Sequence, residues 1–189
     1  MNKQIPHYWQ NVIGWFHESD TEFYKKMINQ VLEPAHFVEV GCWKGKSSSY
    51  MAVEIVNSGK NIQFDCVDTW LGDLNDPIHQ NDPSVAGGTL YNEFIENMKP
   101  VEGHYKAVRM DSVLAAANYE DNSLDLVFID AAHDYESVKA DILAWFPKIK
   151  INGIISGHDY GHPPVKQAVH EFLTDVNDGG GGPWSTVKK

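Results

Sequence analysis

Along the chain, segments with apolar residues at helical spacing alternate with short continuous apolar runs. The first pattern predicts helices and the second predicts strands. Phe23, Met27, Ile28 and Val31 recur at helical spacing, which predicts an amphipathic helix that ends before Pro34. Short continuous apolar runs are typical of buried strands. They occur at residues 37–40, 62–67, 124–129 and 154–155. This alternation favours an α/β fold in which helices cover both faces of a parallel sheet.

The remaining elements follow from the same pattern and from residues that start or stop helices. Further helices are predicted over 47–56, 90–98 and 138–149, with others starting near 113 and 163, and short strands over 105–109 and 184–187. Gly59 is expected to end the helix over 47–56. Asp134 is expected to cap the helix that carries Val138 and Ile142. Asn152-Gly153 is expected to turn the chain from that helix into the strand at 154–155.

The stretch from Trp70 to Gly88 is polar and rich in proline and glycine, which predicts the least regular part of the chain, a long loop. Because it directly follows a strand, we expect a mobile lid over residues 70–88. Residues 1–35 are expected to form an N-terminal helical segment. With 189 residues there is little material for a second core, so one domain over 1–189 is expected.

The composition narrows the choice of partners. The net charge is −11 and the 15 Lys and Arg residues are scattered, which argues against a nucleic-acid partner. No apolar run approaches the roughly 20 residues of a membrane span, and the N-terminus shows no apolar signal region. Cys42 and Cys66 lie in apolar segments and are expected to be reduced. We therefore expect a cytoplasmic protein that acts on a small polar molecule.

The turn after the first strand carries glycines at a spacing that allows a ligand to approach the backbone. It reads Glu39 to Ser47 with the pattern E-x-G-x-x-x-G, in which Gly41 and Gly45 are the glycines. The dinucleotide pattern G-x-G-x-x-G is different, which disfavours a nicotinamide cofactor. A plain tight turn, with Glu39 paired to a cation, is the alternative.

Two acids follow the next two predicted strands. Asp68 stands 27 residues after Gly41, close to the position of an acid that hydrogen-bonds ribose hydroxyls in nucleotide-binding folds. A turn-forming role for Asp68 is the alternative. Asp111, followed by Ser112, could accept a hydrogen bond from an adenine amino group or could cap the next helix.

A second group of polar residues, Asp130, His133, Asp134, His158 and Asp159, is expected at the ends of two neighbouring strands. Carboxylates at such a site suit a divalent cation, and a histidine suits proton transfer. Loop histidines bonded to backbone or water are the alternative for both histidines, and helix capping is favoured for Asp134.

Aromatic residues could wall a substrate pocket next to these strand ends. The candidates are Trp9, Trp15, Phe16 and Trp70. Packing in the core or under the lid explains Trp9, Trp15 and Phe16 better.

Taken in order, these motifs resemble the class I S-adenosylmethionine-dependent methyltransferases, in particular the small "methyltransferase domain" proteins related to macrocin and rhamnosyl O-methyltransferases. The motifs are V-E-V-G-C-W-K-G at 38–45, V-D-T-W at 67–70, R-M-D-S at 109–112, F-I-D-A-A-H-D-Y at 128–135 and G-H-D-Y at 157–160. The resemblance implies a Rossmann-like three-layer sandwich with a seven-stranded, mostly parallel sheet whose last strand is antiparallel. The last two strands look shortened, with the glycine-rich residues 179–182 between them.

The resemblance also implies a cofactor site. S-adenosylmethionine would lie over residues 41–45, with Glu39 and Gly41 at its methionine part, Asp68 at its ribose hydroxyls, and Asp111 with Ser112 at its adenine. The residues expected to bind the cofactor are Glu39, Gly41, Trp43, Gly45, Ser47, Asp68, Thr69, Asp111, Ser112 and Asp130.

For the reaction, the resemblance implies O-methylation of a small hydroxylated, sugar-like acceptor. Relatives bind Mg²⁺ through acids at the positions of Asp130 and Asp159, so Mg²⁺ or Mn²⁺ is expected there. Tyr160 follows the second acid where relatives carry another ligand, so His158 or His133 is expected as the third ligand or as the general base, and Asp130 is expected to take part in catalysis. The partners expected are the acceptor and a second copy of the chain in a homodimer, with no nucleic acid and no membrane. A nicotinamide oxidoreductase and a non-catalytic S-adenosylmethionine-binding protein are the alternatives.

Overall fold

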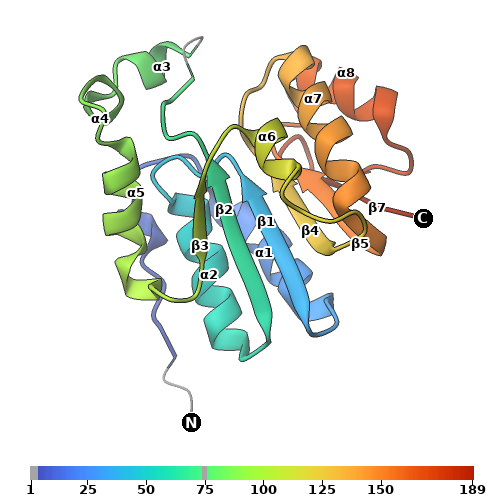
Figure 1. The fold of residues 1–189 in the computed structure, drawn as a ribbon, viewed down its shortest axis with the longest axis horizontal. Coiled ribbons are helices and arrows are strands. Elements are labelled where there is room, and N and C mark those ends of the chain that lie inside the picture. The colour runs from blue at the N-terminus through green and yellow to red at the C-terminus, as the bar shows by residue number, and fades with distance from the viewer. Residues whose placement is uncertain (1–3, 74–75) are drawn as a thin grey trace.

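The computed structural model describes residues 4–73 and 76–189. These residues form a seven-stranded sheet, with the strand order β3-β2-β1-β4-β5-β7-β6, and the helices that cover it (Figure 1). The strands are β1 (Ala35–Val40), β2 (Ile62–Asp68), β3 (Lys106–Arg109), β4 (Leu124–Ile129), β5 (Ile149–Gly157), β6 (Asn177–Asp178) and β7 (Trp184–Val187). Strands β3, β2, β1, β4 and β5 pair in parallel, whereas β7 runs antiparallel to β5. The expected mostly parallel sheet with an antiparallel last strand is confirmed.

Helices cover both faces of this sheet and complete the three expected layers (Figure 1). One face packs against α1 (Glu18–Gln30), α2 (Lys46–Ser58) and α5 (Leu90–Met98), with the 3-10 turns η1 (Trp9–Asn11) and η2 (Lys99–Val101). The other face packs against α6 (Ser112–Ala116), α7 (Tyr135–Trp145) and α8 (Pro163–Phe172), and η3 (Phe146–Lys148) follows α7. None of the helices in the described residues has the length and apolar character needed to cross a membrane.

The side chains of β1 pack alternately against the helices on the two faces of the sheet. Successive side chains of a strand point to opposite faces. Phe37 accordingly joins the core under α1 and α2, while Val38 and Val40 join the core under α7 and α8. Glu39 shares the face of Phe37 and is 1% exposed. Apart from His36 near its start, the strand is therefore apolar on both faces except for one buried acid, beside the turn that carries the glycines.

Most predicted helix ends are confirmed by their capping geometry. Gly59 ends α2 in a left-handed conformation with φ +69°. Asp134 starts α7, and its carboxylate accepts a hydrogen bond from the Ser137 backbone N–H at 3.0 Å. The Asp134 cap satisfies an amide that would otherwise lack a partner at the helix start.

Residues 70–88, predicted as a long loop, contain more regular structure than expected. Two short helices lie there, α3 (Pro77–Gln80) and α4 (Pro83–Ala86). Each begins with an Asp-Pro pair: the Asp76 carboxylate accepts from the Ile78 amide at 2.7 Å, and the Asp82 carboxylate accepts from the Ser84 amide at 2.9 Å. An aspartate cap followed by proline is a helix-start signal, and here it occurs twice. Leu74 and Asn75, which belong to the predicted lid, lie outside the described residues.

The boundary between α7 and β5 also differs from the prediction. Ile149 was expected on the helix, but α7 ends at Trp145 and Ile149 is the first residue of β5, paired with Leu124. The expected turn at Asn152 and Gly153 is an irregular segment within β5, where the pairing shifts between Leu124 and Leu126 and Asn152 has φ +68°. An Asn-Gly pair is compatible with either geometry because both residues tolerate positive φ.

The aromatic residues considered as pocket walls divide into buried and exposed ones. Trp9 and Phe16 are buried in the core, as the core-packing interpretation predicted. Trp70 is 2% exposed and packs against Phe94 of α5, so it is also a core residue. Trp15 is 51% exposed, which makes it the member of the set that is accessible to a partner.

Candidate functional site

A cavity of about 510 Å³ opens at the carboxyl ends of the parallel strands. Ligands in open α/β sheets bind at this edge, where the loops after neighbouring strands diverge. The expected cofactor residues that line the cavity come from the ends of four strands: Gly41, Trp43, Asp68, Thr69, Asp111, Ser112 and Asp130. The structure thus brings together the residues that the sequence motifs placed far apart along the chain.

Glycine is required at the start of the first turn because the ends of β1 and β4 approach closely there. Gly41 has φ +86°, and a Cβ at this position would lie 2.0 Å from the Asp130 carbonyl oxygen. Gly45 has φ +88° and is the cap residue of α2. Any side chain at 41 would collide with the backbone of Asp130, so the first glycine permits the close approach of two site segments.

Asp68 holds the glycine turn in place through three backbone amides. Its Oδ2 accepts hydrogen bonds from the N–H groups of Cys42 at 2.8 Å and Trp43 at 2.9 Å, and its Oδ1 accepts from the N–H of Trp70 at 2.7 Å. Burial raises the pKa of Asp68, while these amides oppose that rise. A carboxylate has about four acceptor positions, so one remains available, on Oδ1. The ribose-binding role of Asp68 stays a prediction.

Sequence reasoning missed that the glycine turn is tied to α4 and α5. The Lys44 side chain is 5% exposed, and its Nζ lies 2.8 Å from an oxygen of Asp82 and 3.1 Å from an oxygen of Glu93. Burial lowers the pKa of Lys44, but these two carboxylates outweigh it and raise the pKa overall. The sequence signal that could have indicated this link is the lysine between Trp43 and Gly45. A charged side chain can be buried in a turn only if oppositely charged or hydrogen-bonding groups reach it.

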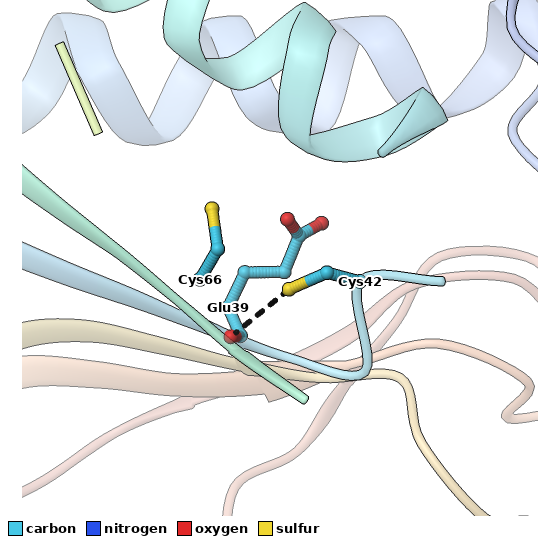
Figure 2. Close-up of side chains that lie close together, drawn as sticks. All are labelled: Glu39, Cys42 and Cys66. Carbon is cyan, nitrogen blue, oxygen red and sulfur yellow. Dashed lines mark hydrogen bonds between the residues drawn. The ribbon is translucent and has the colours of Figure 1, made fainter. Parts of the chain in front are cut away.

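Three expected cofactor residues, Glu39, Gly45 and Ser47, do not line the cavity. Figure 2 shows the Glu39 carboxylate pointing toward α2, beside the sulfur atoms of Cys42 and Cys66. The carboxylate accepts hydrogen bonds from the hydroxyls of Tyr24 and Ser48, and burial raises its pKa to about 7. Its partners are thus internal to the protein. Both cysteines are free and buried, as predicted.

The far end of the cavity is built by α6 and α7. The Asp111 Oδ1 accepts from the Leu114 amide at 3.1 Å, so the capping alternative is confirmed, while its adenine contact stays a prediction. Ser112 Oγ accepts from Trp145 Nε1 at 2.9 Å. Asp141 of α7 also lines the cavity and is 5% exposed, although the sequence motifs did not include it. A signal was present, because Asp141 interrupts an apolar stripe made by Val138, Ile142 and Trp145.

The second polar group comes together beside this cavity, as expected. His133 Nε2 lies 2.9 Å from Asp159 Oδ2 and 3.8 Å from Asp130 Oδ1. His158 Nδ1 lies 3.3 Å from Asp159 Oδ2, and His158 Nε2 lies 3.4 Å from Asp20 Oδ1. Sequence reasoning missed Asp20, whose distance from the motifs along the chain left no signal. We call Asp20, Asp130, His133, His158 and Asp159 the strand-end cluster. Asp134 is outside it and caps α7.

The charges of the strand-end cluster depend on one another. The carboxylates of Asp130 and Asp159 raise the pKa of His133 to about 10. Burial lowers the pKa of His158, but Asp159 and Asp20 outweigh it and raise that pKa to about 10. Burial raises the pKa of Asp130, whereas the two histidines hold the pKa of Asp159 well below its usual range despite burial. Without a bound cation, positive histidines therefore balance the carboxylates.

Comparisons with known proteins agree with this geometry. The NovP O-methyltransferase structure is similar with a TM-score of 0.70 and 15% identity, over 90% of this chain and 80% of that one. The calicheamicin methyltransferase CalS11 has a TM-score of 0.65 and 16% identity, over 89% and 78%. An O-methyltransferase of Bacillus cereus, solved in complex with SAH, has a TM-score of 0.60 and 15% identity, over 95% and 86%. At these identities the likeness shows the fold.

Sequence comparison adds a relative and a family. The chain is 24% identical over 179 residues to the uncharacterized protein y4gI of Sinorhizobium fredii. The match covers 95% of this chain, which spans 17% of the length of that curated relative. Residues 38–160, well over half of the chain, match the "Methyltransferase domain" family. That segment runs from β1 to the loop after β5 and contains the residues that line the cavity and most of the strand-end cluster. The chain therefore belongs to the methyltransferase domain family and has a class I methyltransferase fold.

Proposed function

We propose that the protein transfers the methyl group of S-adenosylmethionine to a hydroxyl oxygen of a small, sugar-like acceptor. One observation carries this proposal: Asp130 lines the 510 Å³ cavity and also belongs to the strand-end cluster. A smaller hollow, lined by residues that include Asp130, His133 and His158, adjoins the cavity at that point. A methyl donor in the cavity would thus present its reactive end to groups that can accept a proton.

The chemistry requires positioning and the removal of one proton. The acceptor oxygen attacks the methyl carbon in line with the sulfonium leaving group, so both partners must be held in one geometry. A hydroxyl is a weak nucleophile until its proton is removed. Asp130, His133 and His158 are the groups of this chain that we assign to that task, and a histidine can perform it only in the neutral form, which the neighbouring carboxylates disfavour. The Gly41 turn, with its amides held by Asp68, would hold the methionine part of the donor.

The acceptor class rests on similarity and on charge. CalS11 is a TDP-rhamnose 3′-O-methyltransferase, and NovP is an O-methyltransferase, so two structural neighbours of this chain methylate oxygen atoms. The net charge of −11 disfavours a polyanionic acceptor. A hydroxylated, sugar-like molecule fits the first observation, and one that is not a polyanion fits the second.

The residues present fit a divalent cation in the strand-end cluster. One ligand atom each of Asp130, His133 and Asp159 lies within 4.8 Å of the others. His133 Nε2 is a buried atom that makes no hydrogen bond to the protein, although Asp159 Oδ2 lies 2.9 Å away. We propose Asp130 and Asp159 as ligands and His133 as the third, in place of His158, whose Nε2 faces Asp20. Two carboxylates and an imidazole suit Mn²⁺ better than Mg²⁺, which prefers oxygen ligands. Such an ion would lower the pKa of the acceptor hydroxyl.

Calorimetry of the purified protein tests the cofactor before any acceptor is known. We expect binding of S-adenosylmethionine and S-adenosylhomocysteine and no binding of NAD. Asp68→Ala is the matched variant in the cavity, and Asp121→Ala, on the surface between α6 and β4, is the control. Binding of NAD alone, or no binding of either S-adenosyl compound by the folded parent protein, would overturn the proposal.

A further inference from the structure

Asp141 is a buried acid with no part in the proposed reaction. It lies on α7, is 5% exposed, and lines the end of the cavity opposite the strand-end cluster. A carboxylate in such a place has lost most of its water, so it needs hydrogen-bond donors from the protein or from a ligand.

The protein supplies few of these donors. The groups that act on Asp141 are the Ser112 hydroxyl and the carboxylates of Asp111 and Asp134, and no cation is among them in the described part of the chain. Ser112 has one hydrogen to donate, and Trp145 Nε1 already occupies an acceptor position of the same hydroxyl at 2.9 Å. A carboxylate can accept about four hydrogen bonds, so most of the accepting capacity of Asp141 is left to whatever fills the cavity.

Apolar side chains line the cavity together with the Asp141 carboxylate. Met110 and Val113, after β3, line the same end of the cavity with apolar atoms, and Ala140 adds a small side chain beside Asp141. A purine would place its faces against such groups and its edge against the carboxylate. The adenine ring has an exocyclic amino group that donates hydrogen bonds, which is what the carboxylate lacks.

We infer that Asp141 accepts a hydrogen bond from the N6 amino group of the cofactor and selects adenine over 6-oxopurines. The inference rests on the proposed function, because it assumes an S-adenosyl ligand in the cavity. Asp111 is less suited to this task, since it is exposed and its Oδ1 already accepts from the Leu114 amide. A 6-oxopurine would place its carbonyl oxygen against the Asp141 carboxylate, and two facing acceptors repel each other.

Calorimetry with two ligands tests the inference. S-adenosylhomocysteine is compared with S-inosylhomocysteine, which differs by an oxygen in place of the amino group. The parent protein should bind the adenosyl compound at least about tenfold more tightly, as expected for the loss of one buried hydrogen bond. Asp141→Asn should bring the two affinities to within about threefold, because an amide can donate to the 6-oxo group as well as accept from the amino group. Asp141→Ala should lose the preference as well.

Matched variants show whether the preference for adenine belongs to Asp141 itself. Glu136→Gln removes a charge from the exposed face of the same helix and should keep the preference of the parent protein. An unchanged preference in Asp141→Asn, or its loss in Asp111→Asn instead, overturns the inference while the proposed function stands. A folded parent protein that binds neither ligand overturns the proposed function itself. Thermal melting of each variant confirms folding, and the isosteric Asp141→Asn keeps the test valid if Asp141→Ala does not fold.

Discussion

The Trp43 and His79 rings stack with centroids 3.9 Å apart and planes 10° from parallel, which joins the glycine turn to α3. His79 is fixed from its other side, because its Nδ1 accepts a hydrogen bond from the Asp73 amide at 2.9 Å. Lys44, the next residue of the turn, makes the second link through Asp82 at the start of α4. The segment predicted as a lid is therefore fastened at two points to the turn expected to hold the cofactor.

We predict that His79→Ala loosens this segment. Aromatic stacking contributes about 1 kcal/mol, so its loss should raise the population of open molecules, and the rate of proteolytic cleavage within 76–88, about fivefold. His79→Phe keeps the ring without the Nδ1 acceptor and should give an intermediate rate. Limited proteolysis followed by mass spectrometry measures the effect, with the exposed His104→Ala as control. Equal cleavage rates in the parent protein and His79→Ala would show that the stack does not hold the segment.

A second prediction separates two roles of Asp68. Asp68→Ala should weaken S-adenosylhomocysteine binding more than tenfold, and it should destabilise the fold by on the order of 3 kcal/mol because three buried amides lose their acceptor. If Asp68 also contacts the ribose, an analogue without the ribose hydroxyls should lose affinity in the parent protein but little more in the variant. If the affinity losses caused by the analogue and by the substitution are additive, Asp68 does not contact the ribose and only holds the backbone amides of the glycine turn. Calorimetry measures the affinities, and chemical denaturation measures the stability.

The third prediction concerns stability and pH. Burial raises the pKa of Asp141 from its ordinary value of 3.8 to about 6, with Asp111 and Asp134 adding to the rise and Ser112 opposing it. Because the folded-state pKa is the higher one, folding favours the protonated acid. Its contribution to stability is complete below pH 3.8 and is lost as pH rises through about 6, a change of roughly 3 kcal/mol.

Asp141→Asn removes this titration. The ligand-free variant should therefore melt at a higher temperature than the parent protein at about pH 8, and the difference should shrink toward about pH 5. Calorimetric melting curves at several pH values measure it, and Glu136→Gln should show no such trend. A difference that does not vary with pH would show that folding does not raise the pKa of Asp141, and a variant that is less stable than the parent protein at high pH would indicate a cation partner.

The parts of the fold that could be predicted from sequence are those in which local pattern and packing agree. The run from Leu124 to Ile129 is apolar except for Asp125, so its place as a central strand followed from the pattern, and the structure has these bounds. The Ile149 error has the opposite origin. Its spacing from Ile142 and Trp145 fits a helix, but pairing with Leu124 in the sheet outweighs that local preference. The position of Ile149 is decided by residues distant in sequence.

The candidate site divides in the same way. Strand-end residues such as Gly41, Asp68 and Asp130 could be predicted because a parallel sheet brings the ends of its strands together. Asp20 and His79 could not be, since their places depend on how α1 and α3 pack, and neither residue belongs to a motif. Asp141, by contrast, carried a local signal, an acid within an apolar helix face.

The last prediction is that the strand-end cluster binds a divalent cation needed for turnover. Asp130 and Asp159 are two carboxylates close together, and a cation is one way to keep both ionised. The parent protein should bind Mn²⁺ in calorimetry, and binding should be lost in Asp159→Asn but kept in Asp134→Asn, which changes only the α7 cap. Loss of binding in His133→Ala with retention in His158→Ala would identify His133 as the third ligand, and the opposite result would identify His158. Once an acceptor is found, EDTA should abolish methyl transfer and Mn²⁺ should restore it. Full turnover by metal-free protein in EDTA would exclude the cation and leave Asp130, or His133 or His158 in its neutral form, as the base that removes the acceptor proton.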